Sequence, residues 1–503
     1  MALSLRLAGL GRLQTLVFDE VYYVPFALGY WQGAPSFDAH PPLAKYLIAI
    51  GIWLGQWPAA WFGWPTVVVN DTLVSPLAFR WLNAVAGATV PVLLGAIAWE
   101  LGAGGDGYTE EWLSTTAGDS PKSPLERGTL TRPITPLFKG GRGDPLSLCQ
   151  HRFALLAGLL MAMEGLTLVE SRLALINIYG LALGLLGQWG WLRARHSPHP
   201  TRWRWTAGIA FGAAINVKWN WAGLWLGLVL WEFSPKIQNP KPITRNPKDE
   251  PFLPPGLGQT HGSAPTDTRS PHQPYPSGSR YRVYTPSLLY LTILPFITYL
   301  LLWLPHLTLT GESLMGVHRQ LWSTHQSIGE NASHAYCSPW HSWPLMLRPV
   351  AYFYERVGQG EDAIATTIHA MGNPVLWWLS TAAVFSLALG WLARQISLAD
   401  SPAQSSQNAV VSFILLNYLA NWLPWVLVSR CTFFYHAMGM VAFSTLGLAW
   451  LMAKWLGNPQ HRPLALLLLG AIALSFFFWL PLYLGIPLSP EALQRRWLLP
   501  GWI

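Results

Sequence analysis

The sequence predicts an all-α protein that crosses a membrane about ten times, and its composition gives the first reasons. Only 11% of the 503 residues are charged and 51% are hydrophobic, whereas soluble domains carry roughly 25% charged residues. The 30 tryptophans fit the same class, because tryptophan concentrates at membrane–water interfaces. The net charge of +8 comes from Lys and Arg spread between apolar runs, so we expect a lipid bilayer, and no nucleic acid, as a partner.

A membrane-spanning helix needs about 20 mostly apolar residues, and ten segments approach or exceed that length. They cover residues 78–100, 153–170, 173–192, 205–218, 219–233, 286–305, 374–393, 409–428, 433–453 and 464–484. Residues 1–16 are too short for a span and carry two arginines. Residues 43–62 contain Gly and Pro, and predict either one more span or a helix along the membrane surface.

The basic residues indicate the orientation of these spans. They gather after residue 193, within residues 234–285, and between Lys454 and Arg462. If the ten spans alternate in direction, these links share one side, which the positive-inside rule makes cytoplasmic. The segment around Asp19, the 306–373 loop and the C-terminal tail are then extracytoplasmic.

Two long links differ from the spans in composition. Residues 234–285 are rich in Pro, Ser, Asn and Lys, which predicts a disordered cytoplasmic insertion. Residues 102–150 are similar. The insertion would divide the chain into an N-terminal catalytic half, residues 1–233, and a C-terminal half of four to five spans, residues 286–503.

Cysteines and histidines give no recognisable metal pattern. Cys149, Cys337 and Cys431 lie far apart, so we expect neither a zinc site nor a disulfide framework. Five histidines between residues 306 and 341 also match no known ligand spacing. We therefore expect no cofactor, and leave a divalent cation open.

The adjacent carboxylates Asp19 and Glu20 are the first candidates for chemistry. They lie in VFDEVYYVPFA, where aromatic and aliphatic neighbours predict partial burial. Burying a carboxylate costs several kcal/mol unless it is paired or functional, and a raised pKa would suit a general base. A solvated loop or a helix N-cap is the alternative that the residues leave open.

Several cations follow at places that suit an anion. His40-Pro41-Pro42 forms a stiff turn, after which Lys45 is expected to reach toward phosphate headgroups, although the segment also fits a plain structural turn. Outer span ends carry Arg80, Arg172, Lys218 and Arg430. Snorkelling explains such residues in part. Because outward-facing cations oppose the positive-inside bias, we also expect a bound phosphate, which arginine suits.

Seven motifs, taken in order, resemble the protein O-mannosyltransferase family. They are FDEVYY…FDAHPPLAKYLIA, PLAFRWLNAVAGA, LTLVESRLALIN, AAINVKWNWAG, SWPLMLRPVAYFYE, GNPVLWW and SRCTFFYHAMGMVAF. The resemblance covers both ends of the chain and most of its spans. It implies a GT-C fold in a bacterial plasma membrane, with the active site at the extracytoplasmic face. It also implies a polyprenyl-phosphate-linked mannose donor and Ser or Thr of secreted or membrane proteins as acceptors.

The resemblance also assigns roles to residues. Asp19 matches the catalytic base and Glu20 its partner, while Arg80 matches an arginine near the donor phosphate. His40 and Lys45 belong to the matching HPP loop. The C-terminal motifs contain Arg348, Arg430 and His436, which we expect to bind substrate, together with Arg172 and Lys218.

The sequence departs from the family pattern in three places. A full span usually precedes the first outer loop in this family, so we expect that either the true start lies upstream or the first span is missing, and with that span the count would be eleven. Asn177 stands in a region where members often have Asp, so a second acidic role there is in doubt. The 306–373 loop is too short for the MIR domain of eukaryotic members, as in bacterial-type members.

The implied chemistry needs one base. A phosphate leaves without a general acid, unlike the leaving group in glycoside hydrolysis, which uses two carboxylates. Asp19 would deprotonate the acceptor hydroxyl, Glu20 would orient the acceptor or hold Asp19, and Arg80 with Lys218 or Arg430 would stabilise the departing phosphate. The displacement would invert the anomeric centre.

Two other functions stay open at the level of the sequence. A GT-C enzyme of another kind would move a lipid-linked sugar such as aminoarabinose to a lipid or glycan. A transporter of lipid-linked sugars predicts inverted repeats, and the sequence has no visible internal repeat.

Overall fold

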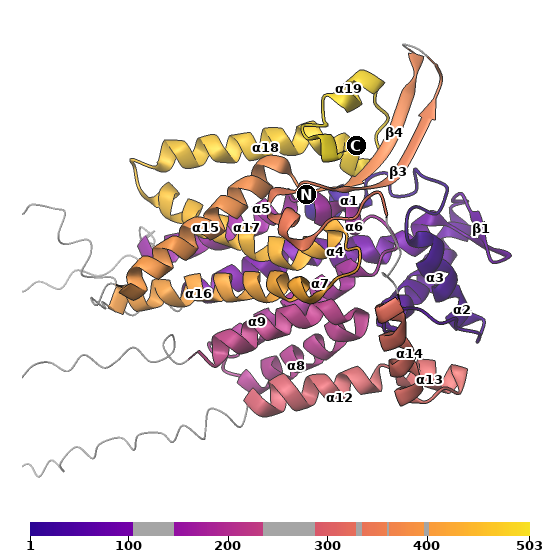
Figure 1. Cartoon of the computed structure of the whole chain (residues 1–503), viewed down its shortest axis with the longest axis horizontal. Helices are drawn as coiled ribbons and strands as arrows, with labels where there is room; N and C mark the ends of the chain where they lie inside the picture. The colour runs from indigo at the N-terminus through magenta and orange to yellow at the C-terminus, as the bar shows by residue number, and fades with distance from the viewer. Residues whose placement is uncertain (104–144, 235–286, 328–333, 360–361, 397–401, 503) are drawn as a thin grey trace, which may run out of the picture.

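The computed structural model describes residues 1–103, 145–234, 287–327, 334–359, 362–396 and 402–502. The expected insertion at 234–285, apart from residue 234, lies outside the described residues, as does most of the 102–150 link. Long helices run side by side along one direction (Figure 1), as expected when each helix must satisfy its own backbone hydrogen bonds in lipid.

The elements follow the chain in this order. The helices are α1 (Ala2–Leu7), α2 (Glu20–Trp31), α3 (Leu43–Trp61), α4 (Pro76–Ala103), α5 (Pro145–Ala162), α6 (Gly165–Glu170), α7 (Asn177–Arg193), α8 (Pro200–Val217), α9 (Ala222–Glu232), α12 (Leu294–Leu301), α13 (Leu304–Thr310), α14 (Leu314–Ser327), α15 (Pro374–Ile396), α16 (Pro402–Trp422), α17 (Met438–Gly457), α18 (Arg462–Leu484) and α19 (Pro490–Gln494). Short 3₁₀ turns are η1 (Trp219–Trp221), η4 (Trp340–Leu345), η6 (Leu423–Leu427), η7 (Phe434–Ala437) and η8 (Pro500–Trp502), and η3 (Leu289–Ile293) is a π-helix. The strands are β1 (Val67–Val69), β2 (Thr72–Val74), β3 (Val350–Val357) and β4 (Ile364–Ala370).

Each of the ten expected spans contains helix, so the predicted fold class is confirmed. Among the described residues, six helices are long and apolar enough to cross a membrane: Pro76–Ala103, Leu289–Thr310, Pro374–Arg394, Gln407–Leu427, Phe434–Gly457 and Arg462–Leu484. The expected span 153–170 is broken where α5 ends and α6 begins. Glu164 causes this break, because its carboxylate accepts hydrogen bonds from the backbone N–H of Leu166 (2.9 Å) and Thr167 (2.7 Å) as a helix N-cap.

Small residues allow the helices to approach closely. α7 packs on α8 and α9, and α4 packs on α5 and α7. At Gly180 of α7 an added Cβ would lie 2.1 Å from the indole of Trp221, so only glycine permits this contact. Close packing through small residues is typical of helices in lipid.

The two ends of the bundle differ. One end, which we call the site end, carries α2, α3, α13, α14 and the β1–β2 hairpin (Figure 1). The opposite end carries Arg193, which pairs with Glu100 at 3.1 Å, and Arg195, which pairs with Glu232 at 2.5 Å. These two cations, which belong to the group that indicates orientation, therefore lie away from the site end.

Helix α3 lies across the site end instead of running along the bundle. Its first residue, Leu43, donates its backbone N–H to Asn216 Oδ1 at the end of α8 (3.2 Å). Further along α3, the carbonyl of Gly51 accepts from Trp81 Nε1 near the start of α4 (2.8 Å). Of the two alternatives for residues 43–62, these contacts favour the surface helix, and the exposed face of α3 carries Trp57.

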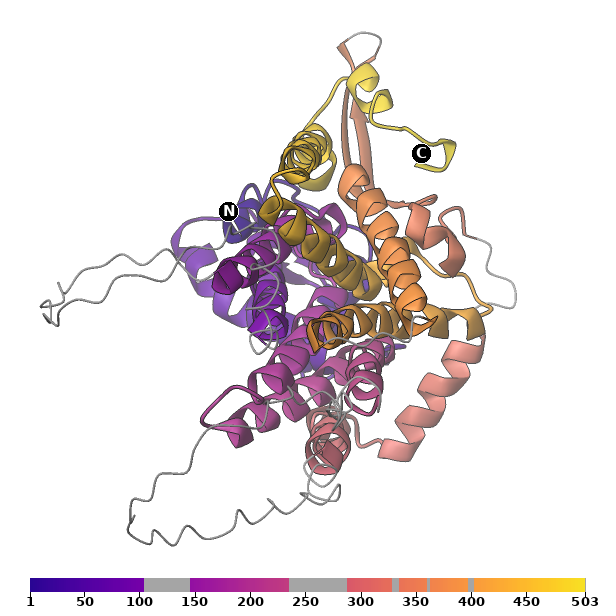
Figure 2. The ribbon, with the colours of Figure 1, turned by 90° about the vertical axis from the view of Figure 1, so that its left-hand side faces the viewer.

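The 306–373 loop contains structure that the sequence did not predict. α14 lies within it, and β3 pairs antiparallel with β4, with an irregularity between Ala351 and Phe353 that leaves Tyr352 outside the register. The hairpin projects beyond the helices near α19 (Figure 2).

A disulfide joins Cys337 in this loop to Cys431. The expectation of no disulfide framework is therefore wrong. The two cysteines are 94 residues apart in the chain, and only the fold brings them together.

Candidate active site

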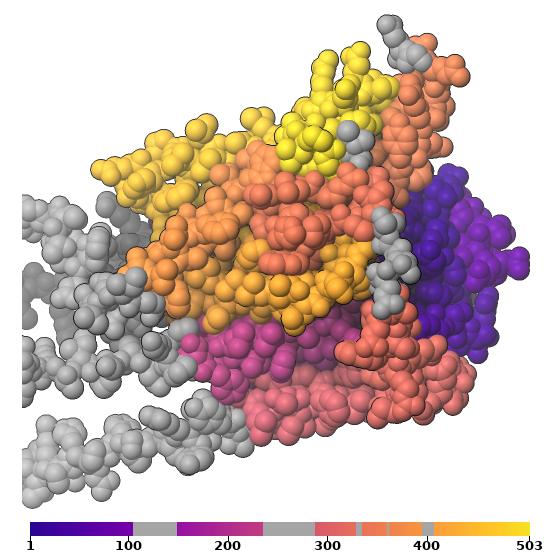
Figure 3. All heavy atoms as spheres, in the orientation of Figure 1, coloured from indigo at the N-terminus to yellow at the C-terminus, as the bar shows by residue number. Residues whose placement is uncertain are grey.

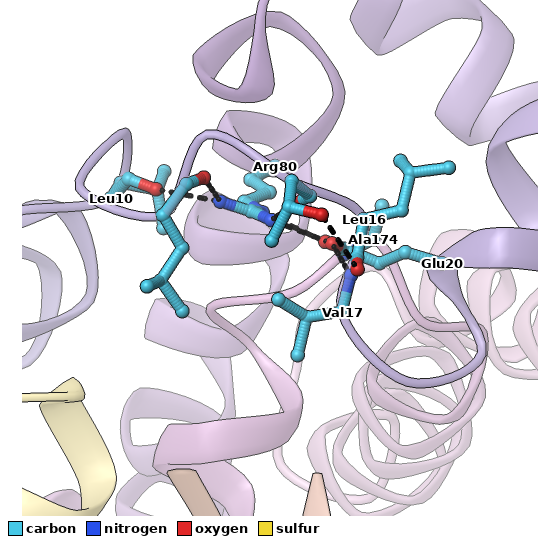
Figure 4. A network of polar contacts seen from close by, with 8 residues as sticks. Leu10, Leu16, Val17, Glu20, Arg80 and Ala174 are labelled. Carbon is cyan, nitrogen blue, oxygen red and sulfur yellow. Dashed lines mark hydrogen bonds and ion pairs between the residues drawn. The ribbon is translucent and has the colours of Figure 1, made fainter. Parts of the chain in front are cut away.

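Glu20 lies at the start of α2 and is fully buried. A carboxylate has about four acceptor positions, and here each has a donor. Oε1 accepts from Arg80 Nε (2.8 Å) and from the backbone N–H of Ala174 (2.7 Å), while Oε2 accepts from Arg80 Nη2 (2.6 Å) and from the backbone N–H of Val17 (2.9 Å). Figure 4 shows this network. Glu20 therefore has no free position for a substrate hydroxyl.

Arg80 is equally saturated. A guanidinium has five N–H donors. Besides its two bonds to Glu20, Arg80 donates to the carbonyl oxygens of Leu10 (3.2 Å), Leu13 (2.9 Å) and Thr15 (2.8 Å). In this structure Arg80 has no N–H left for a phosphate, contrary to the expectation from the resemblance, and instead anchors the segment that leads to Asp19.

Asp19 has the opposite surroundings although it is the next residue. Within the described residues, no hydrogen bond or ion pair reaches its carboxylate, which is half-buried. Burial raises the pKa of Asp19 to about 6, although the positive charge of Lys218 acts in the other direction. An unpaired carboxylate with a pKa near neutrality is suited to accept a proton.

The backbone before Asp19 is strained. Phe18 has φ of 53°, a left-handed conformation that costs a non-glycine residue on the order of 1–3 kcal/mol and is often found at functional sites. Its ring stacks on Tyr352 of β3, with ring centroids 3.9 Å apart. The Tyr352 hydroxyl in turn donates to the buried carboxylate of Glu170. The hairpin thus holds Phe18, and through it the position of Asp19.

Lys218 lies where α8 ends and η1 begins, close to Asp19. Its Nζ is 3.4 Å from Asn177 Oδ1 and 3.4 Å from His436 Nε2, and 5.3 Å from the centre of the Tyr435 ring. Asn177 also donates to Glu170 at 3.1 Å. Asn177 is therefore part of the site, and the second acidic side chain of this region is Glu170.

The HPP turn is held by Lys45. The three N–H donors of its ammonium go to Asp38 Oδ2 (2.5 Å) and to the carbonyl oxygens of His40 (2.7 Å) and Pro41 (3.1 Å). Contrary to expectation, Lys45 does not reach outward to headgroups, because the turn uses all its donors. Burial and the nearby charges of Lys218 and Lys45 lower the pKa of His40 well below its usual range, so its imidazole is neutral at pH 7.

A cavity of about 990 Å³ opens beside Lys218. Its lining comes from the HPP turn, the η1–α9 segment, α14 and residues 420–430. The lining residues are His40, Pro41, Lys218, Trp219, Asn220, Ala222, Gly223, Trp225, Leu226, Trp322, His325, Gln326, Ala420, Asn421, Pro424, Trp425, Leu427, Val428, Ser429 and Arg430. It therefore combines basic groups with a wall of tryptophans.

Two segments that are distant in sequence meet at the site end. Residues 17–62 and residues 304–327 lie side by side there (Figure 3). The Tyr30 hydroxyl is 2.8 Å from His306 Nδ1, and the Tyr46 hydroxyl accepts from the backbone N–H of His306 at 3.0 Å. These contacts hold α13 against α2 and α3.

The expected site residues divide into two groups. The structure brings Asp19, His40, Lys218, Arg430 and His436 to the cavity or next to it, as their contacts and the cavity lining show. The other expected residues hold the fold: besides Glu20, Arg80 and Lys45, these are Arg172, which donates to the carbonyl oxygens of Leu5, Arg6 and Ala8, and Arg348, which donates to those of Ala335 and Gly501.

The sequence did not single out Glu170, Tyr352 or Asp38. Glu170 stands in the quoted motif LTLVESRLALIN, and its position in an apolar run was the available signal. Tyr352 and Asp38 gave no such signal, because their partners are set by the fold. Among the described residues, no group of three or more His, Cys, Asp or Glu side chains is arranged to hold a metal ion, and independence from metal stays a prediction.

Comparison with known proteins identifies relatives over the whole length. The family model described as dolichyl-phosphate-mannose-protein mannosyltransferase matches residues 1–104 and 146–310, and the C-terminal four TMM region of protein-O-mannosyltransferase matches residues 310–502. Polyprenol-phosphate-mannose–protein mannosyltransferases are 24% identical in Mycolicibacterium smegmatis (97% of this chain, 88% of the relative) and 25% identical in Mycobacterium tuberculosis (99% and 88%).

A solved structure has the same fold. The protein O-mannosyltransferase Pmt1–Pmt2 complex of Saccharomyces cerevisiae, bound to the sugar donor, contains a chain that superposes with a TM-score of 0.70 at 15% sequence identity. The match covers 100% of this chain and 91% of the yeast chain. At this identity the likeness establishes the fold.

Proposed function

The chain belongs to the protein O-mannosyltransferase family, and on that premise we propose that it transfers mannose to proteins. The donor is a polyprenyl-phosphate-linked mannose, as in the names of its bacterial relatives. The acceptors are Ser and Thr hydroxyls of secreted or membrane proteins. The reaction takes place at the extracytoplasmic face of a bacterial plasma membrane, with the site end outside.

The contrast between the two adjacent carboxylates is the observation that carries this proposal. Glu20 has all its acceptor positions filled, while Asp19 is unpaired and its pKa is raised to about 6 by burial. A hydroxyl is a weak acid and needs a base to become a nucleophile. Asp19 supplies that base, and Glu20 fixes the start of α2 so that Asp19 stays in place.

The reaction is a single displacement at the anomeric carbon. Asp19 takes the proton of the acceptor hydroxyl, the hydroxyl oxygen forms a bond to the anomeric carbon, and the bond from that carbon to the phosphate oxygen breaks. The lipid phosphate leaves with the electron pair, so no general acid is required. Attack from the side opposite the phosphate inverts the configuration.

The cavity is the place for the donor phosphate and the start of its prenyl chain. Lys218 and Arg430 line it, and cations fixed in advance stabilise charge that develops on a departing phosphate. Trp219, Trp225 and Trp322 provide apolar surface for the isoprenoid. This assignment replaces Arg80, whose donors are occupied, as the phosphate ligand.

A transfer assay in membranes tests the proposal. Mannose and other sugars on polyprenyl phosphate are offered with a Ser/Thr-rich peptide, to the wild type and to Asp19→Asn. We expect mannosyl peptide from the wild type and a loss of at least about 10²-fold in the variant. Transfer to a lipid with none to peptide, or preference for another sugar, overturns the proposal. Full activity in Asp19→Asn refutes the choice of base.

A further inference from the structure

We propose that the Cys337–Cys431 disulfide is a positioning element of the transfer reaction: it holds Arg430 at the cavity so that the guanidinium meets the donor phosphate. The proposal rests on the function proposed above, in which the cavity takes the donor. It assigns a task to two cysteines that the sequence left without one.

The Cys337 side of this bond is firmly anchored. The next residue, Ser338, donates its backbone N–H to the carbonyl of Thr432 (2.7 Å), and its own carbonyl accepts from Thr432 Oγ1 (2.7 Å) and from Trp343 Nε1 (2.9 Å). Trp343 is fully buried and stacks near His436, with ring centroids 6.2 Å apart. The loop that contains Cys337 is therefore tied to the interior of the bundle.

The link that contains Arg430 is tied to the same loop through Thr432, but Ser429 and Arg430 themselves make no hydrogen bond among the described residues. Residues 428–433 form an irregular link between η6 and η7. Arg430 is half-buried at the cavity, and among the described residues no hydrogen bond or ion pair holds its guanidinium. The nearest bonds on either side of these two residues are the hydrogen bond from the backbone N–H of Val428 to the carbonyl of Trp425 (3.1 Å) and the disulfide at Cys431. The disulfide therefore limits where Arg430 can point.

An anion is the partner that fits this arrangement. Arg430 shares the cavity with Lys218, and its positive charge is one of the influences that, after burial, lower the pKa of both His40 and His325. Like charges repel, and although carboxylates lie near Lys218, no ion pair reaches Arg430 among the described residues. A phosphate between Lys218 and Arg430 would relieve that repulsion and accept charge-assisted hydrogen bonds from the guanidinium.

The decisive experiment measures binding and transfer separately in the purified full chain. Polyprenyl phosphate is the binding probe, read by quenching of the cavity tryptophans, and mannosyl transfer gives KM for the donor and kcat. The variants are Cys337→Ser with Cys431→Ser, Arg430→Gln, and all three changes together. Cys149→Ser, a change at the remaining half-buried cysteine on α5, is the matched control.

We expect the double cysteine variant to bind the probe about tenfold more weakly, with a similar rise in KM and little change in kcat. The same cysteine changes should have no further effect in the Arg430→Gln background, because neighbours that act through one contact are not additive. The control should bind as the wild type does. If the cysteine changes weaken probe binding equally in the wild-type and Arg430→Gln backgrounds, or if they lower kcat alone, the proposal is overturned. The disulfide would then only stabilise the fold.

A second measurement covers the case in which the double variant fails to fold. The folded wild type is treated with a reductant, and thiol labelling of Cys337 and Cys431 verifies opening. Weaker probe binding on reduction supports the proposal, and unchanged binding contradicts it. Because probe binding does not depend on turnover, a wild type that binds polyprenyl phosphate but transfers no mannose to peptide refutes the proposed function alone.

Discussion

Asp19 and Glu20 are consecutive residues in surroundings of opposite kinds. On the Glu20 side, two buried charges satisfy each other, and backbone groups fill the remaining positions of Glu20 and Arg80. On the Asp19 side, Lys218 and Glu170 lie nearby, yet the Asp19 carboxylate has no hydrogen bond within the described residues. The first side holds a segment in place, and the second keeps a group free for substrate.

The difference shows how a pair of acids can divide two tasks. A buried charge without partners is costly, so the full pairing of Glu20 stabilises the fold. The same pairing leaves Glu20 no lone pair with which to accept a proton from a substrate. A catalytic group must give up such pairing to keep its lone pairs for the reacting proton. The comparison can be tested from both sides.

Removing the partner of Glu20 should have the largest effect on stability. Arg80→Gln leaves Glu20 buried without its counter-charge, which we expect to lower the free energy of unfolding by about 3–5 kcal/mol. Thermal unfolding in detergent measures the change. Arg495→Gln is the control, because its pair with Glu491 is exposed and such pairs contribute about 0–1 kcal/mol. If Arg80→Gln and Arg495→Gln lower the free energy of unfolding equally, the Glu20–Arg80 pair does not have the structural role that distinguishes Glu20 from Asp19.

The Asp19 side should show itself in the pH dependence of transfer. A base acts only when it is ionised, and the pKa of Asp19 is about 6. We therefore expect kcat/KM to be close to its maximum at pH 7, to halve near pH 6, and to fall about tenfold per unit below that. Initial rates across this range give the profile. A rate that stays level down to about pH 4.5 contradicts a raised pKa at the base.

Removing the hydrogen bond between Tyr352 and Glu170, which supports the position of Asp19 through Phe18, should have the smallest effect on transfer. Tyr352→Phe keeps the ring that stacks on Phe18 and removes only the hydroxyl that donates to Glu170. One such bond contributes about 0.5–1.5 kcal/mol, so we expect transfer to fall about 2- to 10-fold. Tyr354→Phe on the exposed part of β3 is the control and should retain wild-type transfer. If Tyr352→Phe and Tyr354→Phe transfer mannose at the same rate, the contact of β3 with Phe18 does not help to position Asp19.

The sequence predicted the spans because long apolar runs are required wherever a helix crosses lipid. It left α3 undecided, since a surface helix and a span can have the same length and similar composition. The packing of α3 across α4 and α8, through Trp81 and Asn216, distinguishes them.

Neighbouring residues in the sequence allowed the burial of the candidate site residues to be predicted, but not their pairing partners. Aromatic neighbours indicated that Asp19 and Glu20 are shielded from water. Their different roles depend on Arg80, 60 residues further along, and on Ala174, 154 residues further along. The disulfide likewise depends on a contact across 94 residues. Pairings over such distances come from the packed fold and have no local signature.

The most direct test compares Asp19→Asn with Glu20→Gln, two isosteric changes at adjacent positions, for mannosyl transfer and for the midpoint of thermal unfolding. The division of tasks predicts that Asp19→Asn loses transfer at least about 10²-fold with an unchanged midpoint, while Glu20→Gln lowers the midpoint clearly. If Asp19→Asn still transfers mannose at the wild-type rate, or if Glu20→Gln abolishes transfer with an unchanged midpoint, the account is contradicted.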